Sequence, residues 1–407
     1  MTVISSLTPN QIAGLSTTAI AGLTATDIQS LSTSQVAALT AAQVNVLNTT
    51  DIQAFYTTQV AALSPNIINA LLTLQIQNFL GTQIGALTST QVSKLANAEI
   101  SALNTTELQG LSSTQVSGLT ATQIGNLTTT VLNNLTTTQI AALTTAQVQG
   151  LTTTQLNGIS TTNLDAIQAA KLTTTQITGL TTTTFGALVG TQISQLIAAE
   201  IAALSTGQIG QLTTTELQTL STTQANALTA TQIGNLTTTV LNNLTTTQIA
   251  ALTTAQVQGL TTTQLNGIST TNLDSLSTPK LTTTQVQGLT TTTIGALTAA
   301  QVHLFTAAEF GAMAVTQINK LTTTEMGQLT TAQAAALTST QMAGMTTTNF
   351  DALTSTTGIP SLSVQAISGV TTTEISSLST TQGNAFTTTQ IESMSIAQLD
   401  ALVTLVG

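Results

Sequence analysis

The sequence predicts an all-α repeat solenoid of short capped helices, one helix for each octapeptide. Three observations support this prediction. An eight-residue repeat runs through nearly all of the 407 residues. Two apolar positions recur in it, and a helix-capping motif lies between them. One octapeptide is too short to fold alone, so neighbouring repeats must stack around a shared core.

The repeat has the consensus Leu-Thr-x-x-Gln-Ile-x-x, and its positions are numbered 1 to 8 from the leucine. Position 1 is apolar in all 47 octads, and position 6 is large and apolar in 44 of them. Position 2 is Thr or Ser in 38 octads, and position 5 is usually Gln. The apolar pattern is therefore regular enough to form a continuous core.

We expect a single continuous solenoid over residues 1–407, interrupted where the octad frame breaks. Two five-residue units end in Lys, and each is three residues shorter than an octad, which is close to one helical turn of 3.6 residues. The local helix should therefore be lost or shortened. We also expect the solenoid to kink or shift in phase at each unit. The predicted segments are a lead (1–6), octads (7–166), a five-residue break (167–171), octads (172–275), a five-residue break (276–280), octads (281–352), a nine-residue break (353–361), octads (362–401) and an apolar tail (402–407).

The motif Thr-x-x-Gln is the capping box of a helix N-terminus. The Thr hydroxyl accepts from the backbone N–H three residues later, and the Gln side chain reaches back to the Thr N–H. Acids are favoured in the first turn by the helix dipole. Nine of the 14 acids lie at position 5: Asp27, Asp51, Glu99, Glu107, Glu200, Glu216, Glu309, Glu325 and Glu374.

A β-solenoid is the alternative fold. Thr, Ile and Val favour strands, and stacked Gln or Thr could form ladders. Strict alternation, however, places positions 1 and 6 on opposite faces of a strand. A turn within each octad could correct this, but Gly is not fixed at one position to make it.

Composition argues against several functional classes. The net charge is −10, and four Lys are the basic residues, so nucleic acid is an unexpected partner. There is no Cys, and His303 is the single histidine, so we expect no metal site, no catalytic triad and no cofactor. No stretch is apolar for about 18 residues, so no membrane span is expected. We predict a protein that is not an enzyme.

Some octads carry an apolar residue at the cap position, where a polar residue at a solvated corner is expected. These are Leu72, Leu80, Val189, Ile197 and Ala314. Leu72 and Val189 are 117 residues apart, as are Leu80 and Ile197. Local drift of the repeat is one explanation. The other is an apolar strip that contacts another subunit, formed by Leu72, Leu80, Val189 and Ile197.

The two ends of the repeat suggest a second kind of contact between subunits. A solenoid that stays soluble needs terminal repeats with a polar outer face. Residues 1–6 carry no charged side chain, and the tail contains Leu402, Val403, Leu405 and Val406. We therefore expect exposed core at both ends and head-to-tail or lateral polymerisation into a fibre. The alternative is that the ends fold over or fray.

The repeat LTTTQIAALTTAQVQGLTTTQLNG (135–158) resembles the Thr/Gln-rich octapeptide repeats of large bacterial secreted surface proteins of the fibre and adhesin type. This resemblance implies an extracellular or cell-surface location, possible export by type I secretion, and roles in filaments, adhesion or the biofilm matrix. Calcium-binding nonapeptide repeats, which many type I substrates carry, are absent from this sequence.

Two functional hypotheses follow. The first is a structural subunit of an extracellular bacterial fibre or matrix whose partner is itself. The alternative is a surface adhesin that recognises a host or glycan partner. Aromatic side chains are the usual sugar platforms, and the chain has only seven Phe and Tyr56, which favours the structural subunit.

The helical prediction can be tested by far-ultraviolet circular dichroism of the purified chain. The capping box at octad spacing predicts a helical spectrum despite the high Thr content. A single minimum near about 218 nm, typical of β-sheet, would favour the alternative fold.

Overall fold

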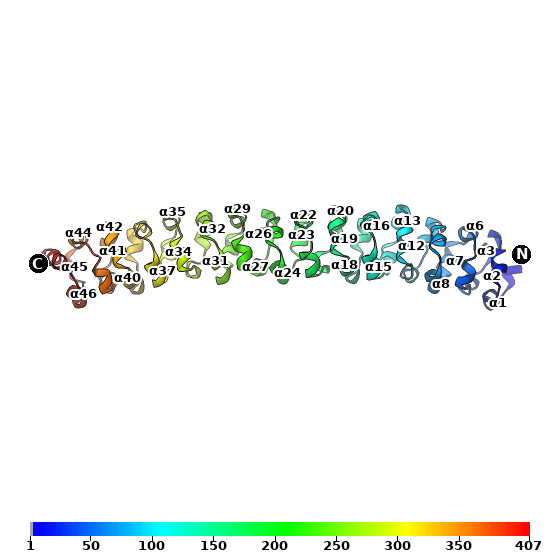
Figure 1. The fold of residues 1–407 in the computed structure, drawn as a ribbon, viewed down its shortest axis with the longest axis horizontal. Helices are drawn as coiled ribbons and strands as arrows, with labels where there is room; N and C mark the ends of the chain where they lie inside the picture. Colours follow the sequence, from blue (N-terminus) through cyan, green and yellow to red (C-terminus); the bar gives the residue numbers. More distant parts are fainter. Residues whose placement is uncertain (1–2) are drawn as a thin grey trace. The chain divides into compact units, whose positions relative to one another are not determined.

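A computed structural model describes residues 3–407. Within these residues it contains short α-helices and 3-10 helices and no strand, which confirms the predicted α solenoid and rules out the β-solenoid alternative. Most helices have four to six residues, and each follows the last after a short extended segment (Figure 1). The chain divides at residues 204 and 205 into two compact units, which are described separately.

The first unit, residues 3–204, contains one helix for each octad and a 3-10 helix at the first five-residue break. Its elements are η1 (Val3–Ser6), α1 (Pro9–Ala13), α2 (Thr17–Ala21), α3 (Ala25–Ser30), α4 (Thr33–Ala37), α5 (Ala41–Val44), α6 (Thr49–Ala54), α7 (Thr57–Ala62), α8 (Pro65–Ala70), α9 (Thr73–Gln77), α10 (Gly81–Ile84), α11 (Ser89–Val92), α12 (Asn97–Ala102), α13 (Thr105–Gly110), α14 (Ser113–Gly118), α15 (Ala121–Asn126), α16 (Thr129–Asn134), α17 (Thr137–Ala141), α18 (Thr145–Gly150), α19 (Thr153–Gly158), α20 (Thr161–Ala166), η2 (Ala169–Lys171), α21 (Thr174–Thr178), α22 (Thr182–Gly186), α23 (Gly190–Ile193) and α24 (Ala198–Ala203).

The second unit, residues 205–407, repeats this organisation with two 3-10 helices. Its elements are α25 (Thr206–Ile209), α26 (Thr214–Thr219), α27 (Thr222–Ala227), α28 (Ala230–Gly234), α29 (Thr238–Asn242), α30 (Thr246–Ala251), α31 (Thr254–Gly259), α32 (Thr262–Gly267), α33 (Thr270–Ser275), η3 (Thr278–Lys280), α34 (Thr283–Gln287), α35 (Thr291–Ile294), α36 (Ala299–His303), α37 (Ala307–Ala312), α38 (Val315–Ile318), α39 (Thr323–Gly327), α40 (Thr331–Ala336), α41 (Ser339–Gly344), α42 (Thr347–Asp351), η4 (Ile359–Ser361), α43 (Val364–Ile367), α44 (Thr372–Ser377), α45 (Thr380–Gly383), α46 (Thr388–Glu392) and α47 (Ile396–Val406).

Three octads make one coil of the solenoid. Each helix packs on the helix three places along the chain, as in the pairs α15 and α18, α28 and α31, and α37 and α40. A coil therefore has three sides with one helix on each. The sequence alone did not predict this number, because the octad pattern is compatible with any number of octads per coil.

Positions 1 and 6 form the core, as the sequence predicts. Leu143 at position 1 and Ile140 at position 6 are almost completely buried, and most of their equivalents in both units are buried as well. The half-buried exceptions lie near the two ends of the repeat and are Leu7, Leu15, Leu23, Ile391 and Leu399. Burying such a side chain contributes roughly 2–3 kcal/mol. Helices on one side approach so closely that a Cβ atom on Gly150 would lie 2.6 Å from the Ala121 oxygen. This contact accounts for the glycine at position 8 of that octad.

Most helices begin with the predicted capping box. In the octad of α19, the Thr152 N–H donates to Gln155 Oε1 at 2.7 Å, and the Gln155 N–H donates to Thr152 Oγ1 at 3.1 Å. The flanking Thr152 backbone is extended, with ψ at 156°. These two bonds satisfy backbone and side-chain groups that a helix N-terminus would otherwise leave unpaired.

The other end of the same Gln side chain joins one coil to the coil before it. Gln155 Nε2 donates to the Ile124 oxygen at 2.9 Å and to the Leu127 oxygen at 2.7 Å. In the second unit, Gln264 Nε2 donates in the same register to the Ile233 and Leu236 oxygens. Position 5 therefore caps its own helix and bonds to the carboxyl end of the helix four places earlier, at the junction that leads into the preceding coil.

Asn residues at position 7 compensate where position 5 cannot cap its own helix. The shorter Asn163 at position 5 bonds to the preceding coil but does not reach the Ser160 N–H. That N–H donates instead to Asn133 Oδ1, one coil earlier, at 2.7 Å. The same arrangement joins Thr346, where position 5 is also Asn, to Asn319 Oδ1.

The five-residue units replace an α-helix with a three-residue 3-10 helix. In the first unit, η2 packs between α18 and α23, which is the place that an octad helix would take. Lys171 Nζ donates to the Leu143 oxygen at 2.6 Å and so takes over the bond that Gln makes elsewhere. Lys280 makes the equivalent bond to Leu252 in the second unit. The local helix is shortened as expected, but the coil keeps its three sides.

The nine-residue break also contains a 3-10 helix that takes the place of an octad helix in the coil. Its helix η4 packs against α40, three places earlier, so it also forms one side of a coil. Gln390 Nε2 donates to the Ile359 oxygen at 2.9 Å and to the Leu362 oxygen at 2.7 Å. The bonds between coils thus continue across this irregular segment.

The apolar tail is not an exposed end of the core. It continues the last octad helix, so that α47 extends over 11 residues and packs on α44 and α45. Gly383 replaces the large apolar residue of position 6 in α45. A Cβ atom there would lie 2.7 Å from Val406 Cγ1 and 2.8 Å from Leu405 Cδ2. The glycine therefore makes room for the tail.

The bonds between coils predict that Gln155→Glu destabilises the protein. Glu keeps the cap acceptor but loses the two hydrogen bonds to Ile124 and Leu127, and leaving buried groups unpaired costs about 1–3 kcal/mol each. Urea denaturation at about pH 7, followed by circular dichroism, measures the change in unfolding free energy.

Gln11→Glu is the matched control. Gln11 caps Thr8 through Oε1 in the same way, but its exposed side chain makes no bond between coils within residues 3–407. We expect this variant to stay within about 0.5 kcal/mol of the parent chain, as is usual for surface substitutions. Equal effects of the two substitutions would contradict the assigned role of Nε2.

Candidate interaction surface

The candidate functional surface consists of large apolar side chains at helix cap positions. Leu72 and Ile197 are each 59% exposed, and Leu80 and Val189 are also exposed. All four belong to the first unit. They correspond to positions that hold Thr or Ser in most other octads.

The fold does not need apolar side chains at these positions. The backbone N–H of Leu72 donates to Gln75 Oε1, and that of Leu80 donates to Gln83 Oε1. At Ile197, the acceptor is Glu200 Oε2 at 2.9 Å. Each helix therefore keeps the half of the capping box that position 5 supplies, while the apolar side chain remains in solvent.

The four residues do not form one strip. Leu72 precedes α9 and Leu80 precedes α10, and consecutive helices lie on different sides of a three-sided coil. Leu72 and Val189 are separated by 15 repeat units, which correspond to five coils, and so share one side; Leu80 and Ile197 share the next. Ala314 holds the equivalent cap position of α38 in the second unit.

The structure places Leu80 near an aromatic residue that sequence reasoning did not select. Helix α10 packs on α7, which begins after Tyr56, and Tyr56 is 54% exposed at its cap position. On the other side of α10, an open hollow of about 750 Å³ is lined by Leu80 and three glycines, Gly81, Gly85 and Gly110. Treating any non-polar cap residue as a candidate would have identified Tyr56 from the sequence.

The tail residues differ from expectation. Leu402 is buried, Leu405 and Val406 are half-buried, and Val403 is exposed. The predicted subunit contact through the tail stays a prediction, but Leu402 is covered and Leu405 and Val406 are partly covered by the chain itself. The physical reason is that α47 folds these side chains against α45 of the same chain.

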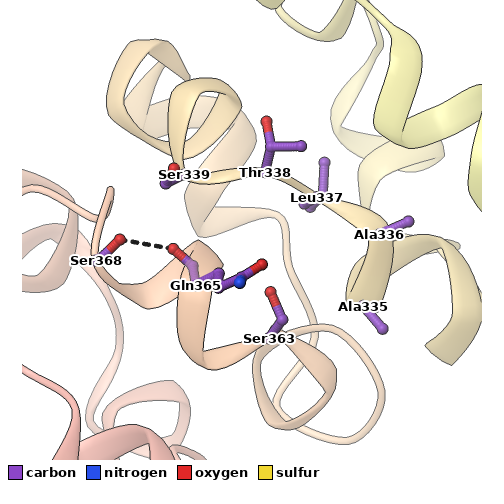
Figure 2. A pocket seen from close by; sticks show the side chains of 8 residues that line it. All are labelled: Ala335, Ala336, Leu337, Thr338, Ser339, Ser363, Gln365 and Ser368. Carbon is purple, nitrogen blue, oxygen red and sulfur yellow. Dashed lines mark hydrogen bonds between the residues drawn. The ribbon is translucent and has the colours of Figure 1, made fainter.

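A smaller polar hollow of about 360 Å³ lies in the second unit between α40, α41 and α43 (Figure 2). Its wall includes Thr338, Ser339, Ser363, Gln365 and Ser368. The Ser368 hydroxyl donates to the Gln365 backbone oxygen at 2.7 Å. No charged side chain lines it, so it offers hydroxyl and amide groups but no general acid or base.

Several acids at position 5 are buried. Asp51, Glu99 and Glu374 have carboxyl groups almost completely removed from solvent, and burial raises the pKa of each. The pKa of the half-buried Asp27 is lowered instead, because the Thr24 backbone and side chain donate hydrogen bonds to its carboxylate. The sequence predicted first-turn acids but not their burial.

Other chemical groups are sparse. Among residues 3–407, no group of three His, Asp or Glu side chains is placed to hold a metal ion. His303 is exposed, and its Nδ1 lies 3.0 Å from the Gln328 backbone oxygen. Within the described part of the chain, every helix is too short or too polar to cross a membrane.

Comparison with known families finds similarity to the ALTTAQ repeat at residues 94–129 and 201–238. The letters of that repeat occur at 142–147, where they cover position 8 of one octad and positions 1 to 5 of the next. The similarity thus covers the capping box and its leucine. No curated protein matches the chain significantly.

Proposed function

We propose that this chain is a structural protein of the bacterial cell surface or extracellular matrix that associates with further copies of itself. The observation that carries the proposal is the exposure of large apolar side chains at cap positions where the fold uses only the backbone. Removing such groups from water is favourable, so a second copy that covered them would gain free energy of association.

The arrangement of these residues favours a lateral contact. Leu72 and Val189 share one side of the coil in repeat register, and Leu80 and Ile197 share another. A second copy lying alongside could contact equivalent residues on the same side. The tail supplies little apolar surface, because Leu402 is buried within its own chain.

Charge repulsion between two copies opposes such association only weakly. Charged residues make up 4% of the chain, so like charges on two copies are far apart along most of the surface. A protein with a high charge density would instead remain separated by repulsion. The many uncharged Thr and Ser hydroxyls offer hydrogen bonds at the margin of an apolar contact.

An adhesin or glycan-binding role is the second candidate, and one observation favours it. Tyr56 is exposed on the helix next to α10, and Leu80 borders an open hollow lined by glycines. An exposed aromatic ring is a suitable platform for a sugar face. This candidate predicts loss of binding in Tyr56→Ala and in Leu80→Thr.

The self-association proposal predicts that replacing the four cap residues by Thr weakens assembly. The variant carries Leu72→Thr, Leu80→Thr, Val189→Thr and Ile197→Thr, which restores the octad consensus. Its helices should keep or gain capping bonds worth about 1 kcal/mol each. Sedimentation velocity over a concentration series should show association of the parent chain and loss of it in the variant.

A matched control carries Leu304→Thr and Ile396→Thr, which remove exposed apolar side chains outside the cap positions. We expect its assembly to equal that of the parent. If the four-Thr variant assembles as the parent does, the proposed surface is wrong. If the parent chain stays monomeric at every concentration, self-association is wrong and the adhesin candidate remains.

A further inference from the structure

The buried acids at position 5 occupy a place that requires a hydrogen-bond donor. In octads with Gln, Oε1 accepts the cap N–H while Nε2 donates to two carbonyl oxygens of the preceding coil. Gln91 shows both bonds: Oε1 accepts from the Thr88 N–H, and Nε2 donates to the Val60 and Leu63 oxygens. A carboxylate has the same shape but no hydrogen to donate.

Glu99 and Glu374 keep the first bond and lack the second. The Ala96 N–H donates to Glu99 Oε2 at 2.7 Å, and the Thr371 N–H donates to Glu374 Oε2 at 2.6 Å. Both side chains are 2% exposed. The other oxygen of Glu374 is buried with no hydrogen-bond partner, and the same is true of Asp51 Oδ2.

Among the residues that the structure describes, no cation pairs with these buried carboxylates. Helix α9, which packs on the helix of Glu99, carries no titratable residue, and the nearby Lys94 is exposed. Around Glu374, α42 contributes Asp351 and α47 contributes Asp400, both acids. A buried unpaired carboxylate is unfavourable, and its neutral form avoids this cost.

We propose that the buried carboxyls of Glu99 and Glu374 act as proton-dependent links between coils. On taking up a proton, a carboxyl group gains an O–H that can donate to the preceding coil, as Gln Nε2 does in other octads. The coils that contain Glu99 and Glu374 are therefore held more tightly in mildly acidic than in neutral solution.

The direction of the pH dependence follows from the pKa values. Burial raises the pKa of Glu99 and of Glu374 in the folded chain, and Asp351 raises that of Glu374 further. The unfolded chain titrates near the ordinary Glu pKa of about 4.3. At a pH above this value the folded chain binds more protons than the unfolded chain, so folding stability falls as pH rises through the folded-state pKa.

The test compares Glu99→Gln and Glu374→Gln, made together in the full chain, with the parent. The parent should melt a few degrees higher at about pH 5 than at about pH 7.5. The double variant should melt above the parent at neutral pH, because each amide supplies the missing donor without a proton. Its melting temperature should also change less between the two pH values.

Glu107→Gln and Glu216→Gln, made together, form the matched control. Both acids are at position 5 and accept the cap N–H, but they are only half-buried. This pair removes the same charge, so it corrects for the general effect of net charge on stability. The control should keep the pH dependence of the parent.

A nuclear magnetic resonance titration of the Glu side-chain carboxyl carbons gives a second, local measurement. Glu99 and Glu374 should titrate above the ordinary Glu pKa. The proposal is overturned if both titrate at about 4.3, or if the Glu99/Glu374 double variant keeps the full pH dependence of the parent. It is also overturned if that variant melts below the parent at neutral pH.

Discussion

The structure depends on one constraint: its helices are too short to satisfy their own backbones. An α-helix leaves four N–H groups unpaired at its start and four C=O groups at its end. A helix of six residues consists almost entirely of such ends. The Gln at position 5 addresses both, because its oxygen accepts an N–H of its own helix and its nitrogen donates to carbonyls of the preceding coil. The same Gln side chain therefore supplies both the helix cap and the bond between coils.

Departures from the consensus show how strictly this constraint operates. Where position 5 is Asn, an Asn at position 7 one coil earlier accepts the uncapped N–H. Where an octad is cut to five residues, a Lys donates to the carbonyl that Gln would reach. Where position 6 is Gly383, the tail of α47 fills the space. Each substitution keeps the buried polar groups paired or the core filled, except at the buried acids, where a donor is missing.

The sequence predicted the helical repeat, the capping box and the two core positions, because these follow from contacts within one octad. It did not predict three octads per coil, since that number depends on contacts between residues about 28 to 31 positions apart. The Gln Nε2 bond and the burial of Glu99 were not predicted for the same reason, because both depend on contacts with the preceding coil. The contact strip was predicted as one surface because the sequence shows spacing but not which side of the coil Leu72 and Leu80 occupy. Tyr56 was not selected, although it breaks the cap consensus in the same way.

The solenoid uses its Gln side chains for internal bonds and displays mainly Thr, Ser and isolated apolar residues at its surface. The central claim, that side-chain amides join the coils, is tested most directly by hydrogen exchange of the Gln side-chain NH₂ groups. The Nε2 hydrogens of Gln155 and Gln264 should exchange far more slowly than those of Gln11, because their bonds are buried between coils. Equally rapid exchange of all three side chains would contradict the account.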